Sequence, residues 1–299
     1  MDTAIYFFND LLKVVTGKVS GKSIQVKKAS CVQLGEGVLI NGVITDEEAL
    51  KQALLRLKKE KKLIGKLRIV IDSTNILTKR CTVPMLAPKQ LLKYTADEFA
   101  DLSETYQDLV CDYAVLEAKA AGGQNGTIIC SAAERELLQR YLDLFSEAKL
   151  KVESIDISLN SFLKAISYMP ELSGKTYIFS IIENGNMTSG LFVDNVYMYS
   201  SRSRLFSPAG TEALANEILS QMSSLIQFNK SEQTKKEIEA AYFCGIDEDT
   251  LKMLAELAQS FSLRVSEMPK TKMASVQDRR IQGIPANYMI PLGCLIRKA

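Results

Sequence analysis

The sequence predicts an α/β protein that repeats one order of elements in two halves, with a small α+β subdomain inserted into the first half. Three short strands joined by tight turns are expected at residues 4–34 and again at residues 177–199. After each set, the hydrophobic pattern changes to helices that alternate with strands. A length of 299 residues is long for a single hydrophobic core and fits two lobes.

The elements of the first half follow from the spacing of its apolar residues. The expected strands are residues 4–8, 11–15, 24–34 and 67–71. A helix is expected to begin at Thr45, which forms a capping box with Glu48. Its lysine-rich end at residues 58–62 complements the helix dipole, and we expect a solvated helix end there rather than a site for anionic lipid.

The inserted subdomain is expected at about residues 73–124. Its elements are a strand at 76–83, a helix that begins at Pro88, a strand at 110–117 and a turn at Gly122-Gly123. The chain then returns to the first lobe. The elements expected there are a strand at 127–130, a helix capped by Ser131 and Glu134, a strand at 151–157 and a helical stripe at 159–166.

The second half follows an expected boundary at residues 170–174. Its elements are strands at 177–182, 188–193, 196–199, 240–244 and 263–266, with helices at 209–229 and after Asp247. A last helix is expected near residues 288–296, where Pro291 confines the regular part to the last two turns. We therefore expect a first lobe at 1–172, a second lobe at 173–285, and a C-terminal helix at 286–299 packed on the first lobe.

Composition excludes several classes of function. The net charge of +2 gives no reason to expect a nucleic-acid partner, and no apolar run approaches the ~18 residues of a membrane span. The start of the sequence lacks the pattern of a secretory signal, so we expect a cytoplasmic protein. Six scattered cysteines are expected to be reduced core thiols rather than metal ligands. The absence of histidine excludes Ser-His-Asp and Cys-His catalysis.

Five motifs, in order and spacing, resemble a known family. They are the opening strand Ile5-Tyr6-Phe7-Phe8-Asn9-Asp10-Leu11-Leu12-Lys13, then Asp112-Tyr113-Ala114-Val115-Leu116, the stretch 148–157, Ser224-Leu225-Ile226-Gln227-Phe228, and the closing stretch 289–297. Together they make the whole chain similar to the type IV pilus assembly PilM family, actin-like relatives of the cell-division protein FtsA. The resemblance implies a bilobed actin-like fold, which is a duplicated ribonuclease-H-like fold.

The chain departs from the actin-like pattern at the two turns that hold nucleotide phosphates. Each turn normally carries D-x-G, in which glycine admits the phosphates and aspartate organises the metal and water. The positions that the resemblance aligns with this site are Tyr6, Phe8, Lys13, Ser180, Ile182 and Gly245. Losing three phosphate contacts removes roughly 5–9 kcal/mol, whereas a micromolar site is worth about 8 kcal/mol. We therefore expect no nucleotide, metal or hydrolysis, with an ATP/Mg-dependent actin-like ATPase as the alternative.

The resemblance implies a cytoplasmic scaffold that lies at the inner face of the membrane through its partners. It would hold the tail of a PilN-like inner-membrane protein in a groove beside the inserted subdomain, together with other pilus platform proteins. The residues expected to line this groove are Ile76, Leu77, Leu91, Leu92, Phe99 and Tyr113. A scaffold of a type II secretion or cell-division system with the same fold remains an alternative.

Overall fold

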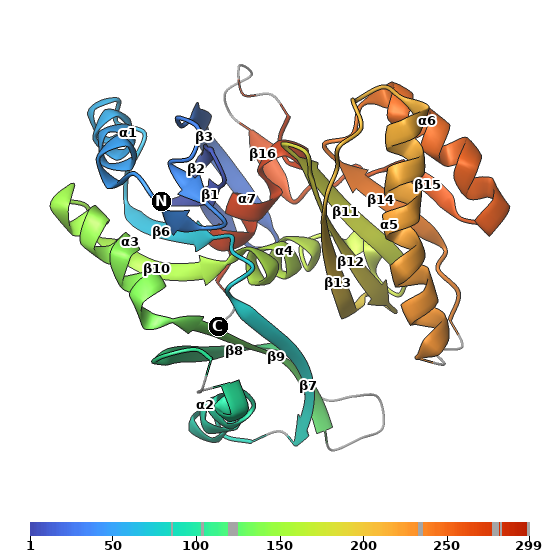
Figure 1. Cartoon of the computed structure of the whole chain (residues 1–299), viewed down its shortest axis with the longest axis horizontal. Coiled ribbons are helices and arrows are strands. Elements are labelled where there is room, and N and C mark those ends of the chain that lie inside the picture. The colour runs from blue at the N-terminus through green and yellow to red at the C-terminus, as the bar shows by residue number, and fades with distance from the viewer. Residues whose placement is uncertain are drawn as a thin grey trace. The chain divides into compact units, whose positions relative to one another are not determined.

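A computed structural model describes residues 1–84, 86–102, 105–118, 125–232, 236–276, 281 and 283–297 (Figure 1). The predicted turn at Gly122-Gly123 lies outside these residues. The chain divides into two units. The first unit contains Met1–Tyr168 and Lys272–Ala299, and the second contains Met169–Thr271.

The first unit is built on a six-stranded sheet with the order β10-β6-β1-β2-β3-β16. Its strands are β1 (Asp2–Phe8), β2 (Leu11–Ser20), β3 (Ser23–Gln33), β6 (Lys66–Ile71), β10 (Val152–Ile157) and β16 (Ala274–Val276). Strand β1 runs antiparallel to β2 and parallel to β6. The short strands β4 (Leu39–Ile40) and β5 (Val43–Ile44) form a separate ribbon.

Helices cover the sheet of the first unit on both faces. Because side chains alternate along a strand, Ile5 and Phe7 enter a core with α1 (Glu47–Lys59) and α3 (Arg135–Glu147). The opposite face of β1 carries Tyr6 and Phe8. Helix α7 (Met289–Leu295) contacts β1, β2 and β6 and packs against α4 (Ser158–Ile166).

The inserted subdomain has its own three-stranded sheet, with the order β7-β9-β8. Its elements are β7 (Leu77–Pro84), α2 (Pro88–Asp97), β8 (Leu109–Glu117) and β9 (Asn125–Glu134). Pro88 lies in the first turn of α2, where its missing N–H and fixed φ are tolerated. Leu91 and Phe99 pack with Val83 and Ile128 in a small core.

The second unit repeats the antiparallel strands and the covering helices. Its sheet has the order β13-β12-β11-β14-β15. The elements are β11 (Tyr177–Glu183), β12 (Asn186–Val193), β13 (Val196–Arg204), α5 (Glu212–Ser231), β14 (Ala240–Cys244), α6 (Glu248–Leu257) and β15 (Arg264–Glu267). Short 3₁₀ turns across the chain are Ala100–Leu102, Pro170–Leu172, Ala258–Phe261 and Ala286–Tyr288.

Two predicted helix caps are wrong. Helix α1 is capped by Asp46, whose side chain accepts the Ala49 N–H, while Thr45 Oγ1 donates to the carbonyl of Gly37. Strand β9 continues to Glu134, so Ser131 lies within the strand and donates to Asp112 O, while Glu134 stands at the N-cap position of α3 without a side-chain cap hydrogen bond. In both cases a tertiary hydrogen bond draws the hydroxyl away from the helix terminus. The predicted cap at Asp247 of α6 is confirmed.

Residues 272–285, which the sequence placed with the second lobe, belong to the first unit. Strand β16 pairs in parallel with β3, opposite Ile24, Gln25 and Val26, and the Ile24 N–H donates to Met273 O at 2.8 Å. Pairing with β16 satisfies backbone groups at the end of β3 that would otherwise lie on an open edge. Helix α7 begins at Met289, before Pro291, because proline is tolerated in a first turn.

Helices α4 and α7 cross with their backbones in contact. A Cβ atom built on Gly293 would lie 1.8 Å from the Ser161 carbonyl oxygen, so only glycine fits at this crossing. Gly35 is a suitable control position, because a Cβ atom built on it would lie near only Val38 Cγ2, at 3.5 Å.

We predict that Gly293→Ala lowers the free energy of unfolding by about 3 kcal/mol or more, because the new methyl group forces α7 away from α4. Gly35→Ala should change it by less than about 0.5 kcal/mol. Urea denaturation followed by circular dichroism measures both variants. Equal stability of the two variants would contradict the backbone contact.

Candidate functional site

The first hairpin that an actin-like site would use carries two stacked aromatic rings. Tyr6 and Phe8 are each 3% exposed, and their ring centroids lie 5.6 Å apart at an interplanar angle of 25°. The chain reverses through Asn9 and Asp10, with Phe8 paired to Leu11. Asp10 accepts a hydrogen bond from Gln33 Nε2 at 2.6 Å. The turn is therefore held by contacts within the sheet.

Lys13 engages the segment that leads into α7. It lies directly across from Tyr6 in the β1–β2 pair. Its Nζ donates to Asn287 O at 2.6 Å and lies 5.6 Å from the centre of the Tyr288 ring. A lysine that could have met a phosphate is thus used in a hydrogen bond and a cation–π contact.

The second hairpin turns through Asn184 and Gly185, both at positive φ, which is typical of a two-residue hairpin loop. Ser180 is fully buried and its hydroxyl lies 2.7 Å from that of Ser189 on the neighbouring strand. Gly245, at φ +75°, lies so close to β11 that a Cβ would be 2.0 Å from the Ile182 carbonyl oxygen. Gly245 therefore has a packing role within the second unit.

Strand alternation moves the predicted positions in this hairpin by one residue. Ile178 and Ile182 belong to the core under α5 and α6, so Ser180 between them also points to that face. Counted from the loop, Glu183 corresponds to Phe8 and Ile181 corresponds to Tyr6. Neither residue is an aspartate or a glycine.

A cavity of about 240 Å³ lies in the first unit where the inserted subdomain meets the main sheet. Two edge strands contribute to it: β10 is the last strand of the six-stranded sheet, and β8 is the last strand of the subdomain sheet. Most of its lining is apolar. The apolar lining residues are Ile76, Val110, Tyr113, Ala114, Ile129, Ala132, Ala133, Leu138, Ile155 and Ile157.

Of the six residues predicted to line a groove here, Ile76 and Tyr113 reach the cavity. Leu91 and Phe99 are buried in the subdomain core, and the side chains of Leu77 and Tyr113 pack against that core. Leu92 is 44% exposed on α2 and does not line the cavity. The sequence pattern marks apolar residues but does not show which of them face the space between two sheets. The cavity-lining residues of β10 were not predicted for this reason.

Asp156 provides the polar end of the cavity and is fully hydrogen-bonded. Its carboxylate accepts from Asn160 Nδ2 and Ser161 Oγ, each at 2.8 Å, and from Lys164 Nζ at 2.5 Å. Both ends of the Asp156–Lys164 pair are 11% exposed. Burial raises the pKa of the neighbouring Cys294 thiol to about 12, so this thiol stays neutral beside the ion pair. The cluster joins the cavity wall to the α4–α7 contact.

A family model described as type IV pilus assembly protein PilM matches residues 8–284. No curated protein matches the sequence significantly. Within the part of the chain that the structure describes, no helix is long and apolar enough to cross a membrane.

Solved structures show that the fold is actin-like, as predicted. A PilM–PilN type IV pilus biogenesis complex matches with a TM-score of 0.77 and 15% identity, over 98% of this chain and 97% of that one. A Bacteroides thetaiotaomicron protein with an actin-like ATPase fold matches with a TM-score of 0.51 and 10% identity, over 89% of this chain and 90% of that one. The ethanolamine utilization protein EutJ of Carboxydothermus hydrogenoformans matches with a TM-score of 0.52 and 8% identity, over 98% of this chain and 88% of that one.

We predict that Lys164→Met lowers the free energy of unfolding by about 3–5 kcal/mol, because it leaves the Asp156 carboxylate buried without its countercharge. Adding Asp156→Asn should restore part of this loss, since the unpaired charge is then removed. Urea denaturation of both single variants and the double variant gives the coupling between the residues. Additive losses would contradict the buried pair.

Proposed function

The chain belongs to the type IV pilus assembly protein PilM family, and from this membership we infer that it is a scaffold that binds a PilN-like inner-membrane protein. The cavity between β8 and β10 receives the cytoplasmic tail of that partner. The chain then works at the inner face of the membrane through its partners and joins the tail to other proteins of the pilus platform. The observation that carries this proposal is an apolar cavity lined by two edge strands.

Edge strands suit an extended peptide. An edge strand presents backbone N–H and C=O groups that no neighbouring strand of its own sheet engages. A tail that lies in the cavity can pair with β8 or β10 through its main chain, while alternate side chains enter the space between the strands. In this mode of binding, main-chain hydrogen bonds to the edge strand give affinity, and pockets for alternate side chains give specificity.

The size and lining of the cavity fit small apolar side chains. Ala114 and Ala133 leave room where larger residues would fill the space, and Ile76 forms an apolar wall. Tyr113 borders the cavity from β8, but its side chain packs against the subdomain core, where its hydroxyl lies 3.4 Å from Pro88 O at the start of α2. An aliphatic segment of the tail is the occupant that this lining favours.

The packing of the first hairpin supports a scaffold that acts without nucleotide. The Tyr6 and Phe8 rings are buried against each other, and Lys13 is engaged by Asn287 and Tyr288. A phosphate group at this turn would have to displace these contacts. No aspartate is placed to organise a metal ion at either hairpin, counted in the register given above.

We predict that Ala114→Phe, which fills the cavity from β8, weakens binding of the partner's cytoplasmic tail peptide about thirtyfold, a loss of about 2 kcal/mol. Leu92→Ala should leave the affinity unchanged, because Leu92 lies in the same subdomain but outside the cavity. Isothermal titration calorimetry measures both variants. Unchanged affinity for Ala114→Phe and Ile76→Ala would place the tail elsewhere.

We also predict that Mg-ATP binds with a dissociation constant of about 1 mM or weaker, which corresponds to only about 4 kcal/mol. Calorimetric titration tests this, with the tail peptide as the positive control for folded protein. Micromolar binding of Mg-ATP would favour the actin-like ATPase instead.

Genes for pilin and pilus motor proteins beside this one would separate a pilus scaffold from a secretion or division scaffold.

A further inference from the structure

One end of the first unit carries a dense set of basic side chains, which we call the basic face. They come from β2, β3, α1 and the loop after it, the start of β6, the segment between α3 and β10, and the end of α7. The members are Lys18, Lys28, Lys58, Lys59, Lys61, Lys62, Lys66, Lys149, Lys151 and Arg297. All are exposed except Lys28 and Lys62, which are half-buried.

Hydrogen bonds show that these residues form one surface. Lys28 Nζ donates to Lys61 O at 2.8 Å, and Lys58 Nζ donates to the carbonyls of Ala148 and Lys149 at 3.0 Å. Thr16 Oγ1, two residues before Lys18, donates to Lys62 O at 3.2 Å. Lys66 and Arg297 share the carboxylate of Glu153, so the start of β6 and the segment after α7 belong to the same face.

The basic face carries a large net positive charge. Among the described residues, Glu60 and Glu153 are the acidic side chains that form ion pairs with it. Ten basic residues against two acidic ones leave an excess of eight positive charges, whereas the whole chain carries +2. The rest of the surface is therefore net negative, and this end is the one that an anionic surface attracts.

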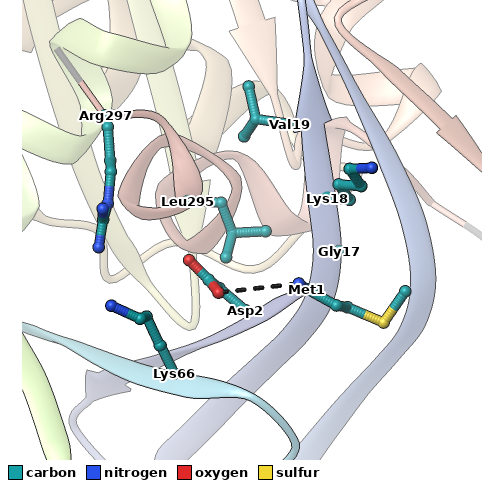
Figure 2. A pocket seen from close by; sticks show the side chains of 8 residues that line it. All are labelled: Met1, Asp2, Gly17, Lys18, Val19, Lys66, Leu295 and Arg297. Carbon is teal, nitrogen blue, oxygen red and sulfur yellow. Dashed lines mark ion pairs between the residues drawn. The ribbon is translucent and has the colours of Figure 1, made fainter. Parts of the chain in front are cut away.

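A cavity of about 330 Å³ opens within the basic face (Figure 2). Lys18, Lys66 and Arg297 line it from three different elements, around Asp2. The Asp2 carboxylate pairs with the buried Arg68 guanidinium at 3.1 Å, so it does not neutralise the other three. A Cβ on Gly17 would lie 2.9 Å from the Gln25 carbonyl oxygen and 3.3 Å from Leu295 Cδ1, so any side chain here would crowd both β3 and the cavity wall.

We propose that the basic face binds the anionic phospholipid surface of a membrane and that the cavity at its centre receives a headgroup phosphate. Nine of the ten residues are lysines, which act as point charges on flexible stems and suit a diffuse anionic surface better than a bidentate site. The choice of a membrane over other phosphate sources rests on the proposed function, which places the chain beside one. This proposal assigns the lysine-rich end of α1 to an anionic lipid surface, where the sequence alone led us to expect only a solvated helix end.

Vesicle co-sedimentation tests this with the whole chain and without any partner peptide. Phosphatidylcholine vesicles containing phosphatidylglycerol should bind the protein, with an affinity that falls as salt is raised, and phosphatidylcholine alone should not bind it. Neutralising one basic residue should weaken binding about fivefold. The triple variant Lys18→Gln, Lys59→Gln, Lys151→Gln should therefore bind about a hundredfold more weakly.

A matched control removes the same charge elsewhere. Lys89→Gln, Lys93→Gln, Lys230→Gln changes exposed lysines of α2 and α5 and should keep vesicle binding. Equal binding by both triple variants would overturn the proposal, as would tighter binding of glycerol phosphate in solution or of an oligonucleotide than of the vesicles. The tail peptide should bind both variants like the wild type, so failure of the lipid site and failure of the tail site give different results.

Discussion

The backbone contact between Gly293 and Ser161 is the constraint on which the first unit depends. It sets α7 against α4 and so brings the segment at Asn287 and Tyr288 onto the face of β1 that carries Tyr6 and Phe8. This face of β1 is in this way used for packing. The same C-terminal segment holds Lys13, which supports the proposal that this turn works without a phosphate ligand.

Helix α4 connects this packing to the proposed tail site. Its Ser161 and Lys164 bind the carboxylate of Asp156, and its Asn160 lies on the wall of the cavity. Ser161, which contacts α7, and Asn160, which lines the cavity, are therefore neighbours on the same helix. A fully satisfied buried cluster of this kind keeps its geometry only when every member is present, so the cavity wall depends on the same contacts as the C-terminal helix.

Elements that the local sequence pattern determines could be predicted, whereas elements that depend on distant parts of the chain could not. The strands at Tyr6 and Tyr177 were predicted because β-branched and aromatic residues surround short turns, and the cap at Asp247 because its carboxylate accepts the Thr250 N–H three residues on. Strand β16 has three residues and is specified by the open end of β3 rather than by its own pattern. The register of Ser180 was wrong by one residue, since a run of apolar residues on both sides hides the alternation. The lysines of the basic face lie far apart in sequence, so only the cluster at residues 58–62 was visible before folding.

Two weak contacts on one unit can act as one strong contact. Glu153, which anchors Lys66 and Arg297 in the basic face, lies on β10 only three residues before Asp156 at the cavity, which is about 10 Å along a strand. A tail anchored in a membrane and bound in the cavity therefore holds the basic face near the lipid surface at a high effective concentration. Neither contact alone needs to be tight. A scaffold that binds in this way would release from the membrane when either the tail or the anionic lipid is withdrawn, and it would need no nucleotide to do so.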